Sequence, residues 1–399
     1  MSTHSYSLGG YGPQKRSAWV KLTARDSAVW RLDWVMVLTG VALSFVGSLL
    51  VWSATRNRTD LNHGDPYYFL TRHVLSLVVG VLLMALTVWV GHRRLRGAVP
   101  ILYGASVLLA LLVLTPLGAT INGQRAWLHL GGGFSLQPAE FIKITMVLGM
   151  AMLLAAKVDA GDREHPDHRT VIQALGLAAA PILIIVLMPD LGSVMVLVMI
   201  VLGVLLASGA SNRWIVGLCV AGAGGAVLVW ALGLLDQYQI NRFAAFANPA
   251  LDPAGVGYNT NQARIAVGSG GLTGKGLFKG SQTTGQFVPE QQTDFVFTVA
   301  GEELGFLGGA LIIFLLGVLI WRACRIARES TELYSTIVAA GVIAWFAFQS
   351  FENIGMTLGI MPVAGLPLPF VSYGGTSMFA VWIALGLLQS IRVQRPVSA

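Results

Sequence analysis

Two carboxylates stand four residues apart in the stretch Phe287-Val-Pro-Glu-Gln-Gln-Thr-Asp-Phe295, at Glu290 and Asp294. They precede a long apolar run, and if the turn that carries them is helical they share one face. Partial withdrawal from water raises the pKa of a carboxylate, which then suits it to act as a general base. Asp294 could equally cap the following helix by accepting hydrogen bonds from backbone N–H groups. Spacing alone does not separate these two roles.

A glycine-rich run, Gly268-Ser-Gly-Gly-Leu-Thr-Gly-Lys-Gly276, is a second candidate. Its glycines let backbone N–H groups approach an anion, and Lys275 supplies positive charge. It is not a Walker nucleotide loop, because Ser269 stands where the first glycine belongs and Gly276 replaces the Ser or Thr after the lysine. A phosphate on a lipid carrier could bind here, and a solvated glycine-rich turn is the structural alternative. The further cations of this region are Arg242, Arg264 and Lys279.

Five ionisable residues lie within apolar stretches, at Glu140, Lys143, Glu302, Glu303 and Glu352. Charged groups are costly in lipid, so they usually face a cavity or one another. Glu140 and Lys143 are three positions apart, which predicts an ion pair along one helix. Contact with a substrate is the alternative for that pair. Glu302 and Glu303 could pair with arginines of other segments.

A polar stretch, Thr120-Ile-Asn-Gly-Gln-Arg-Ala-Trp127, follows the third apolar run. Trp127 could anchor the chain at a membrane surface, and Arg125 could be an ordinary loop charge. The histidines are scattered and show neither HExxH nor another ligand spacing. The sequence therefore predicts no dedicated metal site.

The composition implies that helices in a membrane position these residues. The chain has 399 residues, of which 55% are hydrophobic and only 11% charged, a balance that would give a soluble domain a very large exposed apolar surface. We predict an all-α, polytopic integral membrane protein with about ten transmembrane helices, from the apolar runs long enough to cross the hydrocarbon layer. The predicted spans are residues 34–54, 74–91, 98–115, 139–156, 171–188, 191–207, 214–234, 296–321, 333–361 and 371–391.

Charge predicts the orientation of these spans. Ten spans place both termini on one side, where 17 of the 26 Lys and Arg residues then lie, against 8 on the other side and Lys143 within a span. Positive charge concentrates on the cytoplasmic side, so we predict cytoplasmic tails at residues 1–33 and 392–399 around a membrane domain of residues 34–391. Residues 236–293 form one long extracytoplasmic loop, whose aromatic residues between glycines favour order over a disordered linker.

Two other classes of protein are excluded. The net charge of +7 is spread in small groups between apolar runs, so it forms no stripe of the kind that binds nucleic acid. Cys219 and Cys324 are the only cysteines, which excludes a disulfide framework and a CxxC metal site. Membrane lipids, and not nucleic acid, are the expected surroundings of this chain.

Several short motifs occur in order along nearly the whole chain. They are Asn122-Gly-Gln-Arg-Ala-Trp127, Gln137-Pro-Ala-Glu-Phe-Ile-Lys143, Pro189-Asp-Leu-Gly192, Tyr258-Asn259 with Gln262, Gly268-Ser-Gly-Gly271, Gly274-Lys-Gly276, Pro289-Glu-Gln-Gln-Thr-Asp-Phe295, Gly301-Glu-Glu-Leu-Gly305, Asn353-Ile-Gly355 and Pro367-Leu-Pro-Phe-Val-Ser-Tyr-Gly-Gly375. Together they resemble the SEDS family of cell-wall polymerases, whose members include RodA, FtsW and SpoVE. The chain is most similar to the RodA branch, since FtsW-like chains more often have proline-threonine where Val363-Ala364 stands.

The resemblance implies an enzyme. Family members of this kind polymerise lipid II, a disaccharide-pentapeptide on undecaprenyl diphosphate, into β-1,4 glycan strands outside the bacterial cytoplasmic membrane. It implies that Asp294 is the general base that deprotonates the acceptor 4-hydroxyl. The hydroxyl oxygen then attacks the donor's anomeric carbon, whose configuration is inverted as undecaprenyl diphosphate leaves. One carboxylate suffices, because a diphosphate leaves readily when cations or N–H groups meet its charge, whereas a glycosidase needs two carboxyl groups.

The resemblance also suggests which residues surround this base. The donor diphosphate is expected among cations, and Trp127 with Arg125 is expected at the rim of the cavity. A Mg²⁺ or Mn²⁺ ion could assist the diphosphate, but the sequence shows no ligand set for one. The residues assigned to substrate binding are Lys275, Arg242, Arg264, Trp127, Arg125, Glu290 and Gln262, and those assigned to structure or the cavity are Glu140, Lys143, Glu302, Glu303 and Glu352.

A partner and two rival functions complete the expectations. The chain has no SxxK motif with a downstream KTG, so the resemblance implies a class B penicillin-binding protein as the transpeptidase partner, and a RodA-type role in elongation and cell shape. A division-type polymerase of the FtsW kind is the alternative within the family. A lipid II flippase would need a path open to both faces and no outer base, and a scaffold would need no carboxylate at all.

Overall fold

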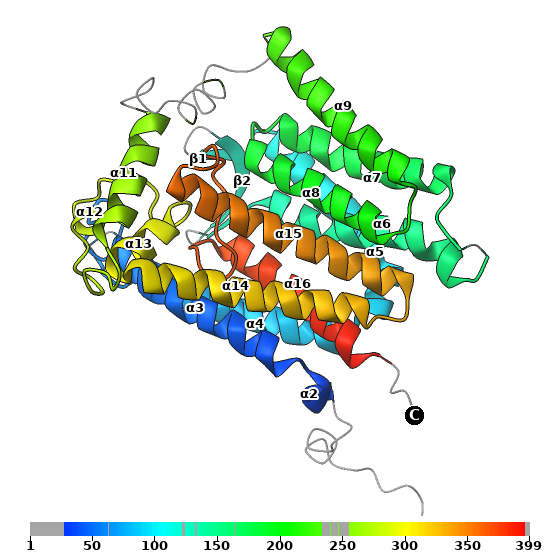
Figure 1. The fold of residues 1–399 in the computed structure, drawn as a ribbon, viewed down its shortest axis with the longest axis horizontal. Coiled ribbons are helices and arrows are strands. Elements are labelled where there is room, and N and C mark those ends of the chain that lie inside the picture. The colour runs from blue at the N-terminus through cyan, green and yellow to red at the C-terminus, as the bar shows by residue number, and fades with distance from the viewer. Residues whose placement is uncertain are drawn as a thin grey trace, which may run out of the picture.

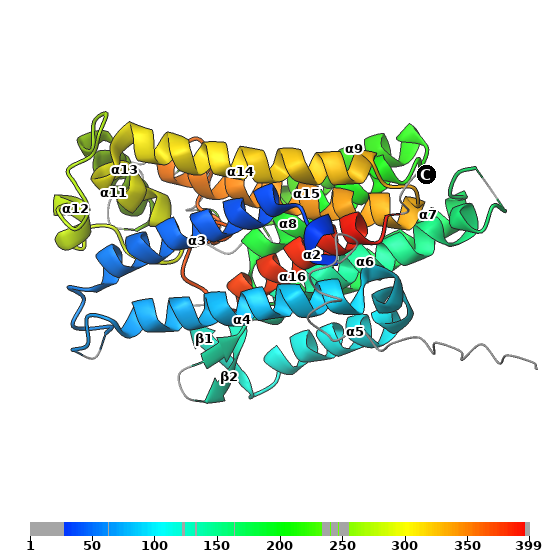
Figure 2. The same ribbon diagram turned by 90° about the horizontal axis from the view of Figure 1, so that it is seen from below.

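The structure is a computed structural model that describes residues 28–62, 64–121, 124–131, 134–162, 164–233, 240, 246 and 255–395. Most of its helices run side by side as one elongated bundle (Figures 1 and 2). The helices are α2 Ala28–Arg31, α3 Trp34–Thr55, α4 Tyr68–Val90, α5 His92–Val113, α6 Pro138–Asp159, α7 His168–Val186, α8 Leu191–Ala207, α9 Asn212–Ala231, α11 Val256–Ser269, α12 Ser281–Thr284, α13 Val296–Glu303, α14 Gly305–Arg328, α15 Leu333–Leu358 and α16 Gly375–Val393. The strands are β1 Gly118–Ile121, β2 Gln124–Gly131 and β3 Phe134–Leu136.

The predicted class, a helical polytopic membrane protein, is confirmed. Eight helices in the described part of the chain are long and apolar enough to cross a membrane: α3, α4, α5, α6, α7, α14, α15 and α16. The shorter apolar helices α8 and the first part of α9, Asn212–Leu228, account for two more of the predicted runs. Every predicted run therefore overlaps a helix, although one run is divided and the runs at 333–361 and 371–391 extend into non-helical residues.

The predicted span at 296–321 is wrong as a single helix. The chain forms α13 up to Glu303 and begins α14 at Gly305, whose φ of +68° is left-handed. A Cβ at Gly305 would lie 2.2 Å from the backbone nitrogen of Gly274, so two glycine backbones meet where the helix divides. The break leaves α13 outside the spans and brings its glutamates against the loop that precedes it.

A small sheet was not anticipated from the sequence. Residues 118–136 include three short antiparallel strands in the order β1-β2-β3, with Thr120 opposite Arg125 and Ala119 opposite Trp127. Threonine, isoleucine and tryptophan between glycines suit a pleated hairpin. The polar stretch after the third span is therefore an extended ribbon beside the bundle, as Figure 2 shows.

The core is built around α16. In its apolar part 83% of the residues are buried, against 28% in α4, which lies beside it. The two helices approach closely because glycines leave room at the contact: a Cβ at Gly80 would lie 2.7 Å from the Trp382 side chain, and one at Gly386 would lie 2.9 Å from the backbone oxygen of Met84. Thus α16 is enclosed by protein, whereas α4 exposes much of its surface.

The bundle has two chemically different ends. Ion pairs join Arg93 to Glu332 at 2.6 Å and Arg96 to Asp159 at 3.1 Å at the end that holds α2 and the end of α16, which we call the terminal end. Arg31 also donates to the carbonyl of Arg395 there. Helices α11, α12 and α13 lie at the opposite end (Figure 1). The first and last described segments therefore lie at one end, as an even number of spans requires.

Candidate active site

Asp294 lies in a turn directly before α13, at the end opposite the terminal end. Its side chain is half-buried, and its backbone nitrogen donates to the carbonyl of Glu290 at 3.1 Å. Phe295 occupies the N-cap position of α13 and makes no side-chain cap hydrogen bond, so Asp294 lies one residue before the cap. A Cβ at Gly365 would lie 3.4 Å from Asp294 Oδ2, so the carboxylate faces the chain at Gly365.

Glu290 does not share a helical face with Asp294. Residues 288–295 form bends and turns, and Glu290 itself has a φ of +51°. Its carboxylate accepts hydrogen bonds from Gln292 Nε2 at 3.2 Å and Thr293 Oγ1 at 3.3 Å. Glu290 therefore helps to shape the turn that presents Asp294, and the helical arrangement considered from spacing does not form.

A non-helical segment at residues 359–374, which we call the inserted loop, lies against this turn. Its apolar side chains Leu366, Leu368, Phe370 and Val371 are at most 2% exposed. Irregular backbone at membrane depth is tolerated only where protein or a water-filled cavity surrounds it. The inserted loop is thus part of the bundle interior and forms one wall of the candidate site.

Asn353 of α15 fastens the inserted loop to the Asp294 turn. Its fully buried Nδ2 donates to the carbonyl of Asp294 at 2.8 Å and to the carbonyl of Leu366 at 2.7 Å. A second link joins Tyr373 N to the carbonyl of Gln292 at 2.8 Å. The position of the Asp294 backbone is therefore set by one helix and one buried loop together.

The predicted ion pair within α6 is confirmed. Lys143 Nζ lies 2.7 Å from Glu140 Oε1, and both side chains are at most 1% exposed. Lys143 also donates to Gln349 Oε1 at 3.0 Å, while Gln349 Nε2 donates to the carbonyl of Pro367 at 2.7 Å. The buried charges thus connect through α15 to the inserted loop. Glu352 is buried on the same helix.

Glu302 organises the loop that contains Lys275. Its carboxylate accepts hydrogen bonds from Lys275 Nζ, Gln282 N, Thr283 N and Thr283 Oγ1 at 2.8 Å each, and from Ser281 Oγ at 3.3 Å. Burial raises the pKa of Glu302, but Lys275 and the other donors outweigh it and hold the pKa below its ordinary value. The expected arginine partner was wrong, and Lys275 is committed to a structural ion pair.

Glu303, the next residue, meets the end of α3. Its Oε1 accepts hydrogen bonds from Ser53 Oγ at 2.7 Å and from Gly280 N at 3.3 Å. Burial raises the pKa of Glu303 above its ordinary value, and the charge of Glu302 acts in the same direction. The pKa values of the two adjacent carboxyl groups are therefore shifted in opposite directions, and together the two side chains attach the loop to the bundle.

Replacement of Glu302 by Gln is expected to destabilise the loop at residues 275–285 by about 3 kcal/mol, since several buried donors lose a charged acceptor. Hydrogen exchange of these amides should accelerate while that of α15 stays slow. Because the pKa of Glu302 is lowered in the folded state from 4.5, wild-type protection should be complete above that pH and fall as pH drops through the folded pKa. Unchanged exchange in the variant would contradict this role.

The other predicted substrate residues are spread around the same end. Gln262 is half-buried and Arg264 exposed on α11, and Arg264 Cδ lies 3.0 Å from where a Cβ of Gly359 would be. Arg264 therefore lies at the start of the inserted loop. Arg242 lies outside the described residues, as does the part of the predicted 236–293 loop before residue 255, apart from residues 240 and 246.

Trp127 and Arg125 lie on β2. Both side chains are half-buried, and Arg125 donates to the carbonyl of Thr115 just beyond α5. Arg125 thus ties the hairpin to the bundle, a role closer to the structural interpretation than to a substrate contact. The hairpin meets the site side of the bundle through Thr376 of α16, whose Oγ1 donates to the carbonyl of Ser135 at 3.1 Å.

Two residues that hold the inserted loop had no assigned role in the sequence analysis, namely Asn353 and Gln349. The available signal was the group of polar residues Gln349, Glu352 and Asn353 in an otherwise apolar run, where helical spacing places them on one face. Among the described residues, no group of three His, Cys, Asp or Glu side chains gathers in a way that could hold a metal ion. The described residues therefore offer no ligand set that could be assigned to a divalent cation.

Comparison with known proteins identifies close relatives. A profile of the FtsW/RodA/SpoVE cell cycle proteins matches residues 33–396. Stage V sporulation protein E of Bacillus subtilis (strain 168) is 37% identical over 360 residues, or 90% of this chain and 96% of that protein. Peptidoglycan glycosyltransferase MrdB of Escherichia coli (strain K12) is 33% identical over 383 residues, or 96% and 97%. The probable peptidoglycan glycosyltransferase FtsW of Trichlorobacter lovleyi is 33% identical, with 90% and 92% covered.

Solved structures agree in fold. The rod shape determining protein RodA of Thermus thermophilus has a TM-score of 0.66 at 31% identity and covers 92% of this chain and 98% of its own. A chain of a peptidoglycan synthase complex, solved for the coordination of polymerization and crosslinking, has a TM-score of 0.73 at 30% identity and covers 90% and 97%. Relatives of several branches match, so the RodA branch stays a prediction. The chain belongs to the FtsW/RodA/SpoVE family, which is the SEDS family expected from its motifs.

Proposed function

We propose that this protein is a peptidoglycan glycosyltransferase that polymerises lipid II, with Asp294 as its general base. Of the three relatives described above, MrdB is named a peptidoglycan glycosyltransferase and FtsW a probable one. The observation that supports the role of Asp294 is its placement: a half-buried carboxylate faces Gly365, and its backbone is held by a fully buried Asn353. Such a fixed, partly desolvated carboxylate suits proton abstraction.

The reaction needs a single base. Asp294 takes the proton from the acceptor 4-hydroxyl as that oxygen bonds to the anomeric carbon of the donor. The bond from this carbon to the diphosphate breaks, so the β-linkage forms with inversion and undecaprenyl diphosphate carries away the electron pair. Positive charge or N–H donors at the leaving group lower the barrier further.

We propose Arg264 as a cation for the diphosphate. It is exposed on α11 beside the inserted loop, whereas Lys275 is bound by Glu302. We assign Arg264 to the donor side, with Gln262 two residues before it on the same helix. Arg242, from the predicted outer loop, remains part of the proposal as a further cation. Trp127 and Arg125, both on β2, remain part of the proposal as the rim of the cavity.

The orientation follows from charge. The terminal end carries the larger share of Lys and Arg, so it faces the cytoplasm of a bacterial inner membrane, and both tails are cytoplasmic. Asp294, at the opposite end, then works on the outer face. The membrane domain spans residues 34–391, with tails at 1–33 and 392–399 and an outer loop at 236–293.

Polymer made on that face needs peptide crosslinks from a partner. A related chain belongs to a synthase complex in which polymerization and crosslinking are coordinated, which supports a class B penicillin-binding protein as the partner. We assign this protein and its transpeptidase partner to elongation and cell shape, because Val363 and Ala364 are RodA-like residues.

Lipid II in detergent micelles separates the enzyme from a flippase, because a micelle has no second face to which a lipid could be moved. Purified protein with a matching transpeptidase should convert fluorescent lipid II into strands that form a ladder on a gel. A lipid II that stays monomeric there, but crosses the bilayer when the same protein is placed in vesicles, would replace the proposed function by transport.

Replacement of Asn353 by Leu is expected to lower the rate of strand synthesis about tenfold, since two buried carbonyl groups lose their donor and the Asp294 backbone is released. The assay is strand synthesis from lipid II at matched protein amounts. Ser350→Ala is the matched control, because Ser350 is also buried on α15 and its hydroxyl contacts no hydrogen-bond partner. Equal losses in both variants would contradict a positioning role for Asn353.

A further inference from the structure

The short helix α2 lies at the edge of the bundle, beside the start of α3 (Figure 1). Trp30 of α2 is 65% exposed, and Trp34, the first residue of α3, is 46% exposed. Trp34 Nε1 donates to the carbonyl of Val29 at 3.1 Å, which fixes α2 against the start of α3. Two exposed indole rings therefore lie together where the first span begins.

A third exposed tryptophan lies close to these two. Trp321 of α14 is 55% exposed, and the next residue, Arg322, donates from Nε to Asp33 Oδ2 at 2.8 Å. Because Asp33 directly precedes Trp34, one ion pair joins the neighbours of both tryptophans. Tryptophan is enriched at the boundary between hydrocarbon and headgroups. The start of α3, and α2 with it, is thus placed at the depth of lipid headgroups.

Asp33 also fixes the point at which the N-terminal tail joins the bundle. Its backbone nitrogen donates to Gln389 Oε1 at 2.8 Å, and Gln389 Nε2 donates to its carbonyl at 3.1 Å. Both residues are buried. Helices α3, α14 and α16 therefore meet at Asp33, so the tail is attached at a defined position on the membrane surface.

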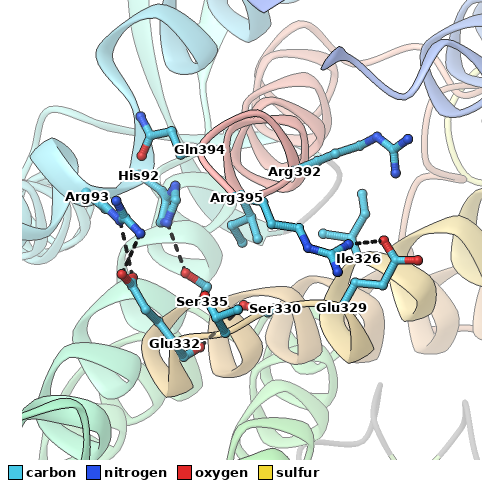
Figure 3. A pocket seen from close by; sticks show the side chains of 12 residues that line it. His92, Arg93, Ile326, Glu329, Ser330, Glu332, Ser335, Arg392, Gln394 and Arg395 are labelled. Atoms are coloured by element: carbon cyan, nitrogen blue, oxygen red, sulfur yellow. Dashed lines mark hydrogen bonds and ion pairs between the residues drawn. The ribbon is translucent and has the colours of Figure 1, made fainter. Parts of the chain in front are cut away.

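Ion pairs within the bundle already engage several other cations of the terminal end. Arg93 lies 2.6 Å from Glu332, and Arg395 lies 2.6 Å from Glu329. In Figure 3 the side chains of each pair point toward one another. The charges of these arginines are therefore matched by carboxylates of the protein itself.

The composition of the tail is different. Residues 1–33 contain five basic residues and only two acidic ones, and one of the two, Asp33, is bonded to Arg322. Apolar side chains, among them Trp19 and Leu22, stand between the basic residues. Such a mixture is typical of segments that lie on a membrane surface, whereas the topology of the spans requires only the charges. The basic residues are Lys15, Arg16, Lys21, Arg25 and Arg31.

We propose that residues 15–31, which we call the basic tail, bind anionic lipid headgroups of the cytoplasmic leaflet. The part before residue 28 lies outside the described residues, and α2 is its attachment to the bundle. Each Lys or Arg near an anionic surface strengthens binding about fivefold. Since α2 holds the tail at the surface, the local concentration of headgroups is high. The proposal rests on the orientation given above and not on the glycosyltransferase activity.

The full-length protein in lipid nanodiscs tests this surface, because both faces of a nanodisc carry the same lipid and orientation does not matter. A fluorescent label is attached at Ser17→Cys in a protein that also carries Cys219→Ala and Cys324→Ala. Its quenching by a lipid with a nitroxide headgroup reports contact with the surface. Quenching should be strong in phosphatidylcholine with phosphatidylglycerol and weak in phosphatidylcholine alone, and it should fall at high salt.

Two combined variants separate the basic tail from charge in general. Replacement of three basic-tail residues by Gln should lower the ratio of bound to unbound tail about 10²-fold. The control removes the same charge from three exposed arginines of other segments and should leave quenching unchanged. The basic-tail variant combines Lys15→Gln, Arg16→Gln and Lys21→Gln, and the control combines Arg94→Gln, Arg169→Gln and Arg213→Gln.

Two results would overturn the proposal: equal quenching with and without phosphatidylglycerol, and equal quenching in the basic-tail and control variants. Strand synthesis from lipid II is measured separately on the same proteins in detergent. A wild type that binds the anionic surface but makes no strands would overturn the proposed function and leave the lipid surface in place.

Discussion

Replacement of Asp294 by Asn is expected to lower the rate of glycan-strand synthesis by about 10²- to 10⁴-fold, the usual contribution of a general base. Asn keeps the size of the side chain and the backbone contact, since Asn353 bonds the carbonyl of residue 294 and not its carboxylate. The loss therefore reports on proton acceptance. Strand length and amount are measured by gel from fluorescent lipid II, at saturating substrate and at matched protein concentration.

Two controls give this result its meaning. Asp60→Asn makes the same chemical change at a 58% exposed carboxylate whose ion-pair partner is Arg58 at 3.8 Å, and it should leave the rate within about twofold, as expected for a weak exposed pair. The melting temperature of Asp294→Asn should match wild type. Strand synthesis by a folded Asp294→Asn protein at the wild-type rate would exclude Asp294 as the base.

Replacement of Lys143 by Met is expected to destabilise the bundle by about 3–5 kcal/mol, because it leaves the Glu140 carboxylate buried without its cation. The pair is at most 1% exposed, so water cannot compensate. Gln349 also loses a donor, and it is Gln349 that holds Pro367 of the inserted loop. Thermal unfolding in detergent should show the loss, and strand synthesis should fall with it.

The double variant Glu140→Gln with Lys143→Met separates charge from packing. Removal of both charges leaves no uncompensated ion, so this protein should be more stable than Lys143→Met alone. A third variant, Glu140→Gln, closes the double-mutant cycle. A double variant as unstable as the sum of the two single variants would show that the ion pair does not couple these side chains, against the 2.7 Å contact.

Local spacing made some of these features predictable. The three-residue interval between Glu140 and Lys143 implies one helical face, and the structure has that pair. The start of the first span is also readable, because Asp33 precedes the apolar run and accepts a hydrogen bond from Met36 N as the N-cap of α3. Such signals lie within one helix turn, where the chain itself brings the residues together.

The remaining features depend on contacts between distant segments. Lys275 and Glu302 are 27 positions apart, and Asn353 reaches the carbonyl of Asp294 across 59 positions. The break before Gly305 depends on Gly274, a residue of another segment. Within an apolar run, nothing in the local pattern separates one helix of 26 residues from a short helix followed by a long one.

The inserted loop also links the site to a helix that contributes no chemistry to it. A Cβ at Gly47 of α3 would lie 2.4 Å from the carbonyl oxygen of Val371, so any larger residue there pushes on the same loop that carries Gly365 past Asp294. Helix α3 thus limits where the inserted loop can lie. A larger side chain at position 47 therefore requires the inserted loop to move, so the surroundings of Asp294 depend on the packing of a helix that contributes no residue to them.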